Sequence, residues 1–178
     1  YATVTTTSLN VEFVDVLAEV QQIIQALAPT IEAKRAKQPV RICVTGLPTS
    51  FPCDRSIGRA IYNLISNSLK FHALEGAIEI LVDGSDTTDR QLVLKVTDNG
   101  IGIEQNDLDK IVLPFRRVHQ RDNYPGTGLG LAIVSNVCRR HGGKLVIESS
   151  IGEGTTMTII IPGRPNEKSA KSAKGAAG

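Results

Sequence analysis

Apolar positions recur at helical spacing in three stretches of this chain, which predicts three amphipathic helices. The first is expected over residues 15–37, with Pro29 bending or splitting it. The second is expected to run from Asp54, as its N-terminal cap, to Phe71. The third covers residues 129–141 and stops at the glycine pair that follows.

The runs that predict strands combine β-branched and apolar residues between turn-forming ones. They cover residues 9–13 as an edge strand, 40–44, 77–82, 91–97, 144–148 and 155–161. The last two flank a Gly-Glu-Gly turn and predict a β-hairpin. A short helix is expected over residues 107–112 and a long mobile loop over residues 113–126. This mixed order predicts an α/β sandwich of two layers, with helices on one face of a mixed sheet.

The composition is that of one soluble domain. The chain has 178 residues, 41% of them hydrophobic and 21% charged, with a net charge of +2. This charge is too small to favour nucleic acid or a membrane surface, and aromatic residues are too few for base stacking. No apolar run has the ~20 residues of a membrane span. We therefore expect a cytoplasmic protein with no nucleic-acid partner and no direct membrane contact.

The cysteines and most of the histidines suggest no special chemistry. Cys43, Cys53 and Cys138 are odd in number and form no C-x-x-C pair, so they indicate neither a disulfide framework nor a zinc site. We expect three buried, reduced thiols. His72 and His141 are expected at the surface.

The second predicted helix carries a pair of amides. In a projection at roughly 100° per residue, its apolar residues fall on one side, and Asn63, Asn67 and Lys70 on the other. Asparagine is a poor helix former, so two of them one turn apart suggest that they hold a ligand. Amide oxygens suit Mg²⁺, and Lys70 could reach a phosphate. An ordinary polar helix face is the alternative.

Two glycine motifs follow. Asp98 ends a predicted strand just before Asn-Gly-Ile-Gly, so its carboxylate could accept a hydrogen bond from an exocyclic amine, or simply belong to a turn. The segment Gly126-Thr127-Gly128-Leu129-Gly130 leads into the third helix, where backbone N–H groups can approach phosphates. It is not a Walker loop, because no Gly-Lys-Ser/Thr follows, and the polar loop before it argues against a dinucleotide fingerprint. An unrelated helix start is the alternative.

With these motifs in this order along the chain, the sequence resembles the catalytic ATP-binding domain of sensor histidine kinases. That domain has a Bergerat-type fold, which is shared with gyrase, mismatch-repair and heat-shock chaperone ATPases. The resemblance covers roughly residues 11–162. The segments that carry it are NLISNSLKF (63–71), DNGIGI (98–103), PFRRVH (114–119), GTGLGLAIV (126–134) and HGGKLVIESSIGEGTTMTIIIP (141–162). Residues 116–133 look most like the phytochrome-type branch. Residues 1–10 would lead in from a dimerisation hairpin. Residues 163–178 are expected to be a disordered basic tail, native or left by cloning.

The resemblance implies roles around the phosphates. Asn67 would bind Mg²⁺, Asn63 would support the metal and the phosphates, and Lys70 would contact a phosphate. The phosphates would lie in the glycine turn formed by Gly126, Thr127, Gly128, Leu129, Gly130 and Leu131. Residues 104–125 would form a lid over ATP, with Phe115 anchoring its hinge. The lid residues expected to swing toward the γ-phosphate are Arg116, Arg117 or His119.

The resemblance also implies an adenine pocket. Asp98 would read the adenine amine, and Thr155 would assist it through water. Phe71 would border the adenine or ribose, and the pocket would be shaped by Gly100, Gly102 and Ile103. Two residues depart from the usual family pattern, since Ser68 replaces a frequent Ala and Phe71 replaces a frequent Tyr. Neither change removes a ligand to the metal or to adenine.

Asn63 decides between the activities of this family. Relatives that hydrolyse ATP carry there a Glu that acts as a general base, and an amide cannot take that role. The resemblance therefore implies transfer of the γ-phosphate to a histidine, whose neutral imidazole is already a good nucleophile. No histidine here has the family's His-Glu/Asp context. The acceptor is expected on a separate dimerisation domain of the parent kinase, with a response regulator downstream, and the fragment is expected to be monomeric. A nucleotide-binding module without transfer activity and a Bergerat-fold ATPase are the alternatives.

Overall fold

The β-branched runs assemble into a five-stranded mixed sheet. The computed structural model describes residues 9–73, 75–116 and 127–163, and the order across its main sheet is β2-β4-β5-β7-β6. These strands are β2 (Val40–Thr45), β4 (Ile78–Asp86), β5 (Gln91–Asp98), β6 (Lys144–Ser150) and β7 (Gly154–Pro162). The pair β2–β4 is parallel because a helix connects the two strands, and the other three pairings are antiparallel.

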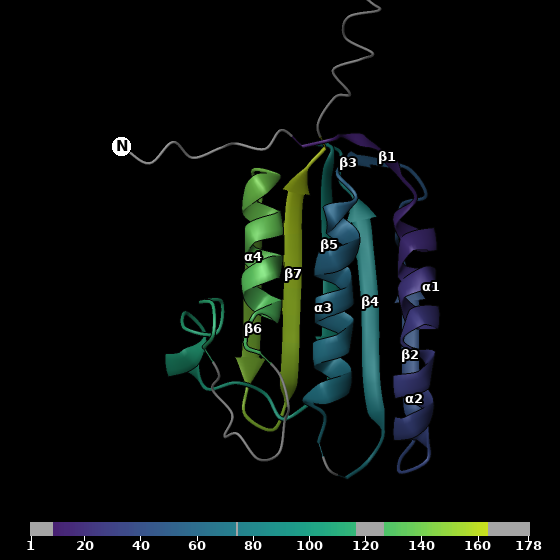
Figure 1. The fold of residues 1–178 in the computed structure, drawn as a ribbon, viewed down its shortest axis with the longest axis vertical. Helices are drawn as coiled ribbons and strands as arrows, with labels where there is room; N and C mark the ends of the chain where they lie inside the picture. Colours follow the sequence, from purple (N-terminus) through teal and green to yellow (C-terminus); the bar gives the residue numbers. More distant parts are fainter. Residues whose placement is uncertain (1–8, 74, 117–126, 164–178) are drawn as a thin grey trace, which may run out of the picture.

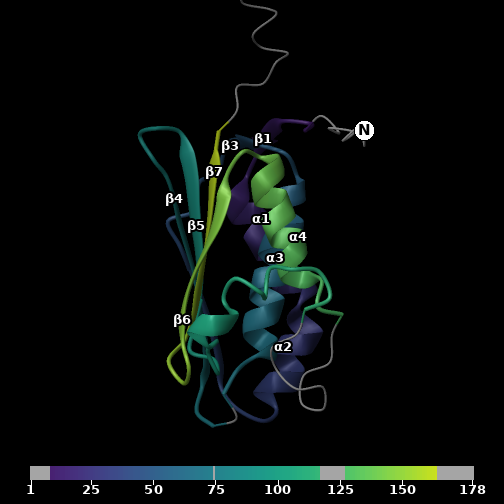
Figure 2. The same ribbon diagram turned by 90° about the vertical axis from the view of Figure 1, so that its left-hand side faces the viewer.

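Four helices cover one face of this sheet (Figure 1). They are α1 (Val16–Ala26), α2 (Ala28–Arg35), α3 (Ser56–Lys70) and α4 (Gly130–Arg140). Figure 2 shows the two layers from the side, with the sheet on one side and the helices on the other. The predicted two-layer α/β sandwich with helices on one face is therefore confirmed.

The core lies between the two layers, where the apolar side of α3 meets alternate residues of the central strands. Strand side chains alternate between the two faces of a sheet, so one residue in two points toward the helices. The buried apolar residues of these strands are Ile78, Ile80 and Val82 from β4, Leu92, Leu94 and Val96 from β5, and Met157, Ile159 and Ile161 from β7. From α3 they meet the fully buried Ile57, Ile61, Leu64 and Ile65. This packing fixes α3 on the sheet and turns its opposite side away from the core.

Several predicted elements are found with shifted ends. The first helix is split as predicted, and Pro29 lies in the first turn of α2. The second begins at Ser56 after the cap residue Arg55, so Asp54, the predicted cap, lies one residue before the observed cap position. Strand β4 continues to Asp86, four residues beyond the predicted end of this strand at residue 82.

Two predictions about short elements were wrong. Residues 107–112 were expected to form a helix, but the structure has only a 3₁₀ turn, η1 (Gln105–Asp107), followed by further turns. No strand was expected between residues 45 and 76, but the structure has a short one, β3 (Phe51–Cys53). This strand pairs antiparallel with β1 (Glu12–Val14), which forms near the predicted N-terminal edge strand but in a separate small sheet.

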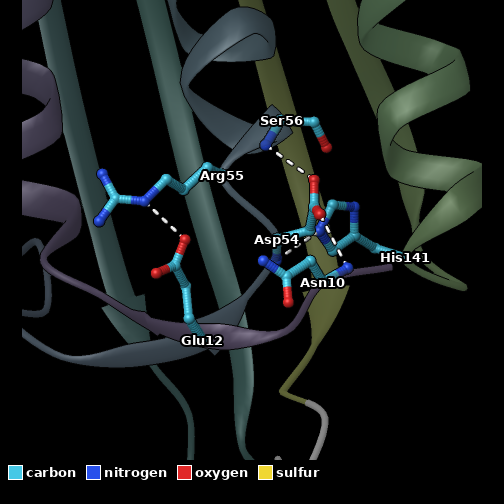
Figure 3. A network of polar contacts seen from close by, with 6 residues as sticks. All are labelled: Asn10, Glu12, Asp54, Arg55, Ser56 and His141. Carbon is cyan, nitrogen blue, oxygen red and sulfur yellow. Dashed lines mark hydrogen bonds and ion pairs between the residues drawn. The ribbon is translucent and has the colours of Figure 1, made fainter. Parts of the chain in front are cut away.

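His141 was expected at the surface and is instead 1% exposed. Its Nε2 accepts the backbone N–H of Asp54 at 3.1 Å, so its Nδ1 carries the proton and donates to the carbonyl of Val137 at 2.8 Å. The Asp54 carboxylate in turn accepts the backbone N–H groups of Asn10 at 3.0 Å and Ser56 at 2.9 Å (Figure 3). This network joins the end of α4, the start of α3 and the N-terminal segment.

Two further expectations about single residues need correction. Cys53 and Cys138 are buried, but Cys43 on β2 is exposed. His72 is half-buried after α3, with its Nε2 2.8 Å from the Lys34 ammonium. Among the described helices, none has the length and apolar character needed to cross a membrane.

Candidate functional site

A cavity of about 300 Å³ lies between α3, α4 and the strand ends of β5 and β7. The structure places most of the predicted site residues on its wall: Asn63, Asn67, Lys70, Phe71, Asp98, Gly102, Ile103, Arg116, Thr127, Gly128, Gly130, Leu131 and Thr155. Gly100 and Leu129 do not line it. The predicted Arg117, His119 and Gly126 lie outside the described residues.

The amide pair sits where the second half of α3 meets the start of α4. Asn63 Nδ2 donates to the carbonyl of Arg59 at 2.7 Å, one turn earlier, so its oxygen is the atom left for a ligand. A Cβ at Gly130 would lie 3.0 Å from Asn63 Oδ1 and 3.7 Å from Asn67 Nδ2. The missing side chain at Gly130 therefore keeps the amide groups open to the cavity.

A cation lies beside the amide pair. The Lys70 ammonium is 4.5 Å from the centre of the Phe71 ring, and both residues line the cavity. Arg116 adds a second positive charge to the wall. This end of the cavity therefore combines amide oxygens with cations, which suits a ligand with anionic groups.

The Asp98 carboxylate marks the other part of the cavity. Its Oδ1 accepts the backbone N–H groups of Gly100 at 3.0 Å and Thr155 at 3.2 Å. Its Oδ2 accepts the hydroxyl of Ser68 at 2.6 Å. The carboxylate reaches this place because Asp98 ends β5 and pairs in register with Thr155 at the start of β7. The Thr155 hydroxyl is directed to Ser149, with 2.8 Å between the two oxygens.

Ser68 is a site residue whose contact the sequence reasoning missed. It lines the cavity directly after Asn67, and its one visible signal was the departure from the usual Ala. A hydroxyl on a buried helix face calls for a hydrogen-bond partner, and this rule could have pointed to Asp98 as a candidate.

The segment after Asp98 is shaped by close backbone contacts. Gly102 has a φ of +71°, and a Cβ there would collide with the carbonyl of Ser150. The next residue, Ile103, donates its backbone N–H to Ser149 Oγ at 2.9 Å. Gly100 is buried against the carbonyl of Phe71, which accepts the N–H of Ile101 at 3.0 Å. Gly100 therefore does not line the cavity itself but packs against Phe71, which does.

The predicted lid hinge has a strained backbone. Phe115 has a φ of +62°, unusual for a residue with a side chain, and the residue is 74% exposed. Its N–H donates to the carbonyl of Gly128 at 3.1 Å, so the main chain of the predicted hinge is bound to the glycine turn that leads into α4. Arg116 follows directly and reaches the cavity wall.

The ligand atoms available on the cavity wall determine which metal ion could bind there. Within the described ranges, no three His, Cys, Asp or Glu side chains gather where they could hold a metal ion. The available donors are the Asn63 and Asn67 amides, whose hard oxygens fit Mg²⁺ better than a softer metal. Two amides are too few for a complete shell, so such an ion would take its other ligands from phosphate oxygens and water.

Comparison with known proteins gives one family. Residues 54–165 match the family model described as "Histidine kinase-, DNA gyrase B-, and HSP90-like ATPase". Cyanobacterial phytochrome A of Nostoc sp. is 34% identical over 154 residues, covering 85% of this chain and 20% of that protein. Phytochrome-like protein Cph1 of Synechocystis sp. is 35% identical over 162 residues, covering 91% and 21%. The chain thus spans about a fifth of the length of these relatives, and the phytochrome-type resemblance is confirmed.

Solved structures agree with this assignment. The chain is similar to the mycobacterial sensor histidine kinase MprB, with a TM-score of 0.69 and 28% identity over 87% of this chain and 99% of that one. The nucleotide-free catalytic domain of histidine kinase ThkA has the same fold, with a TM-score of 0.69 and 21% identity over 88% of this chain and 100% of that one. The chain therefore belongs to the family of histidine kinase-, DNA gyrase B- and HSP90-like ATPases, and within it to the sensor histidine kinases.

Proposed function

We propose that the cavity binds ATP together with Mg²⁺ and that the chain donates the γ-phosphate to a histidine of its parent kinase. The observation that carries the proposal is the pairing, on one cavity wall, of a fixed acceptor carboxylate at Asp98 with the Asn63–Asn67 amide pair. These groups match the two ends of a nucleotide, because the base offers an amine and the other end offers phosphates.

Asp98 would orient the base. Its Oδ1 is held by Gly100 and Thr155, which leaves Oδ2 to accept the exocyclic amine of adenine. The wall beside it is formed by Ile103 and the backbone of Gly102, where a flat ring would exclude water. Phe71 would border the adenine or the ribose.

The phosphates would lie at the start of α4. The backbone around Gly128 and Gly130 would face them, since the first N–H groups of a helix have no partner within it. Asn67, supported by Asn63, would hold Mg²⁺, and Lys70 and Arg116 would contact phosphate oxygens. When bound, Mg²⁺ would help to neutralise the charge that develops on the transferring phosphoryl group.

The transfer needs no general base from this chain. A neutral imidazole nitrogen of the acceptor would attack the γ-phosphorus as the bond to the departing ADP oxygen breaks. Asn63 lacks the basicity needed to activate water, so the site would not hydrolyse ATP. The acceptor would belong to the dimerisation domain of the parent kinase, and a response regulator would receive the phosphoryl group in turn.

The test is a calorimetric titration with ATP, with and without Mg²⁺, on this chain and on its Asp98→Asn variant. We expect Mg²⁺-dependent binding that Asp98→Asn abolishes, whereas Asp86→Asn, the same change at the exposed end of β4, leaves it intact. A parallel assay supplies the parent's dimerisation domain and follows its phosphorylation. Binding without transfer would instead identify a nucleotide-binding module, and steady phosphate release by the chain alone would identify an ATPase.

A further inference from the structure

Ser68 is a buried polar residue that the roles above do not use. It is 4% exposed, and its hydroxyl lies 2.6 Å from Asp98 Oδ2. A carboxylate oxygen has no proton to give when it is ionised, so the hydroxyl is the donor. Hydrogen bonds to a charged acceptor are shorter and stronger than neutral ones, and this distance is typical of them.

The hydrogen bonds around Asp98 leave it one direction for a ligand. A carboxylate has about four acceptor positions. Gly100 and Thr155 take both positions on Oδ1, and Ser68 takes one on Oδ2. The remaining position is on Oδ2, which Ser68 holds in place from the α3 side of the cavity. Without the Ser68 hydroxyl, the two bonds to Oδ1 would still anchor the carboxylate, but Oδ2 would no longer be held.

We propose that Ser68 is a positioning residue that fixes Asp98 Oδ2 and so makes the cavity prefer purines with an amine to purines with a carbonyl at the same ring position. The inference rests on the proposed function for its ligand, while the Ser68–Asp98 hydrogen bond is present in the protein without one. The preference follows from the direction of that bond. Because the proton of Ser68 is committed to Asp98, both groups offer only acceptors to the ligand.

This arrangement strengthens the binding of a ring that carries an amine and weakens the binding of a ring that carries a carbonyl. The amine donates to the one open position of Oδ2. A carbonyl oxygen at the same ring position would lie beside two acceptors, Asp98 Oδ2 and the Ser68 hydroxyl oxygen, and neither would donate to it. It would also lose the hydrogen bonds to water that it makes before binding. Removing the hydroxyl weakens the binding of the amine, because the amine requires the orientation of Oδ2. It also removes one of the two acceptors that a carbonyl would face, so it should not weaken the binding of a carbonyl-bearing ring to the same extent.

The hydrogen bond itself is tested without nucleotide. The backbone amides of Gly100 and Thr155 report on the carboxylate because both donate to Oδ1. Their NMR resonances are compared in the wild-type chain, Ser68→Ala, Asp98→Ala and the double variant. We expect Ser68→Ala to shift both resonances in the wild-type background and to add no shift in the Asp98→Ala background. Unchanged resonances, or equal shifts in both backgrounds, would overturn the positioning role.

The selectivity is tested with two nucleotides. Affinities for ATP and for inosine triphosphate, which has a carbonyl in place of the amine, are measured by calorimetry and, for weak binding, by displacement of a fluorescent ATP analogue. We expect Ser68→Ala to weaken ATP binding about tenfold and inosine triphosphate binding less than about twofold. The control Ser135→Ala, the same change at a half-buried position of α4 outside the cavity wall, should alter neither affinity.

The outcomes separate the two proposals. An equal loss of affinity for both nucleotides would show that Ser68 merely supports the shape of the cavity, and no loss for either would show that it does not position Asp98. A wild-type chain that binds no ATP would overturn the proposed function and the selectivity with it, while the NMR comparison would still decide whether Ser68 holds the carboxylate.

Discussion

At the scale of single residues, the amide of Asn63 has one face available for a ligand. Its nitrogen is bound to the carbonyl of Arg59, which fixes the orientation of the group. The oxygen then faces the place where Gly130 has no side chain. Sequence alone predicted both asparagines as ligands, but it could not predict that a glycine 67 positions later keeps them accessible, because that contact exists only when α3 and α4 lie side by side.

Gly130→Ala should therefore weaken ligand binding without harming the fold. The added methyl would lie 3.0 Å from Asn63 Oδ1, so the amide has to move. We expect a roughly tenfold loss of Mg²⁺-dependent ATP affinity, because a shift of this kind costs about 1–2 kcal/mol. Calorimetry measures the affinity. Chemical denaturation should give an unchanged or higher midpoint, since Ala is the better helix former. An unchanged affinity would contradict the proposed place of the metal and phosphates.

The pKa of Asp54 predicts how stability depends on pH. Burial alone would raise this pKa, but hydrogen bonds from Ser56 and Asn10, with the nearby His141, hold it below its ordinary value. The stability that the carboxylate contributes is therefore present above about pH 4 and is lost as the pH falls toward the lowered pKa. Asp54→Asn should be less stable than the wild type at pH 7, and the difference should shrink as the pH falls below about 4. Urea midpoints across this range measure it, with Asp86→Asn as the control for the loss of one exposed carboxylate. A difference that stays constant with pH would rule out this origin.

At the scale of elements, α3 and α4 meet at two places, one toward each end of α4. One junction is the amide pair and Gly130 at the cavity. The other is the His141 network, which ties the end of α4 to the start of α3 (Figure 3). The helical period predicted the extent of α4 well, but the surface position predicted for His141 was wrong. Its partner Asp54 is 87 residues away in the chain, and only the assembled fold makes that end of the helix an interior position.

His141→Ala should be strongly destabilising. The change empties a site that is 1% exposed and leaves the Asp54 N–H and the Val137 carbonyl without their partner. We expect a loss of about 2–4 kcal/mol in the free energy of unfolding, from the cavity and the lost hydrogen bonds together. Denaturant unfolding provides the measurement, and Arg140→Ala at the exposed neighbouring position is the matched control. A loss below about 1 kcal/mol would mean that the junction contributes little.

The three cysteines lie on different elements and should differ in reactivity. Burial raises the pKa of Cys53 on β3 to about 12, with the nearby carboxylates adding to the effect, and burial raises the pKa of Cys138 on α4 to about 11. Cys43 on β2 is exposed. Since the thiolate is the reactive form, a thiol reagent at pH 8 should label Cys43 rapidly and the other two only after unfolding. Mass spectrometry locates the label. Fast labelling of Cys53 or Cys138 in the folded protein would mean that those elements open readily.

Long elements with a clear period were predictable, and short ones were not. The main-sheet strands and the helices were expected close to where they lie, because each has an apolar face that follows its own repeat. Strand β3 has three residues, one of them Pro52, so no period could show. It forms because β1 lies beside it. The predicted helix at 107–112 failed because a few apolar residues in a short polar segment do not specify a helix.

At the scale of the whole molecule, the cavity is built by segments that are far apart in the sequence. Its wall combines α3, the end of β5, the start of β7 and the start of α4. The motif residues could be recognised one by one, and most of them do meet on this wall. From the sequence, Asp98 could be suspected as the partner of the Ser68 hydroxyl, but the hydrogen bond could not be established, because it depends on where the end of β5 meets the last turn of α3.

Ligand binding should raise the stability of the entire domain. All parts of the cavity wall belong to the folded state, so a nucleotide that binds only there shifts the unfolding equilibrium. At a free Mg-ATP concentration 100 times the dissociation constant, the gain should be about 2.7 kcal/mol. Thermal unfolding with and without Mg-ATP measures it, and Asp98→Asn should remove most of the gain. An equal gain in that variant would show that the nucleotide binds elsewhere.

The small sheet of β1 and β3 has a consequence for how the molecule would respond to mechanical force. Only three residue pairs join these described strands, and they lie beside the start of α3 and the N-terminal Asn10–Asp54 contact. The other end of the described chain, Gly163, is held nearby through its N–H to the carbonyl of Arg90. Tension applied between residues 9 and 163 would therefore load this short ladder before the long strands of the main sheet. Single-molecule pulling should show an early, weak rupture in which β1 peels away while the nucleotide cavity remains whole.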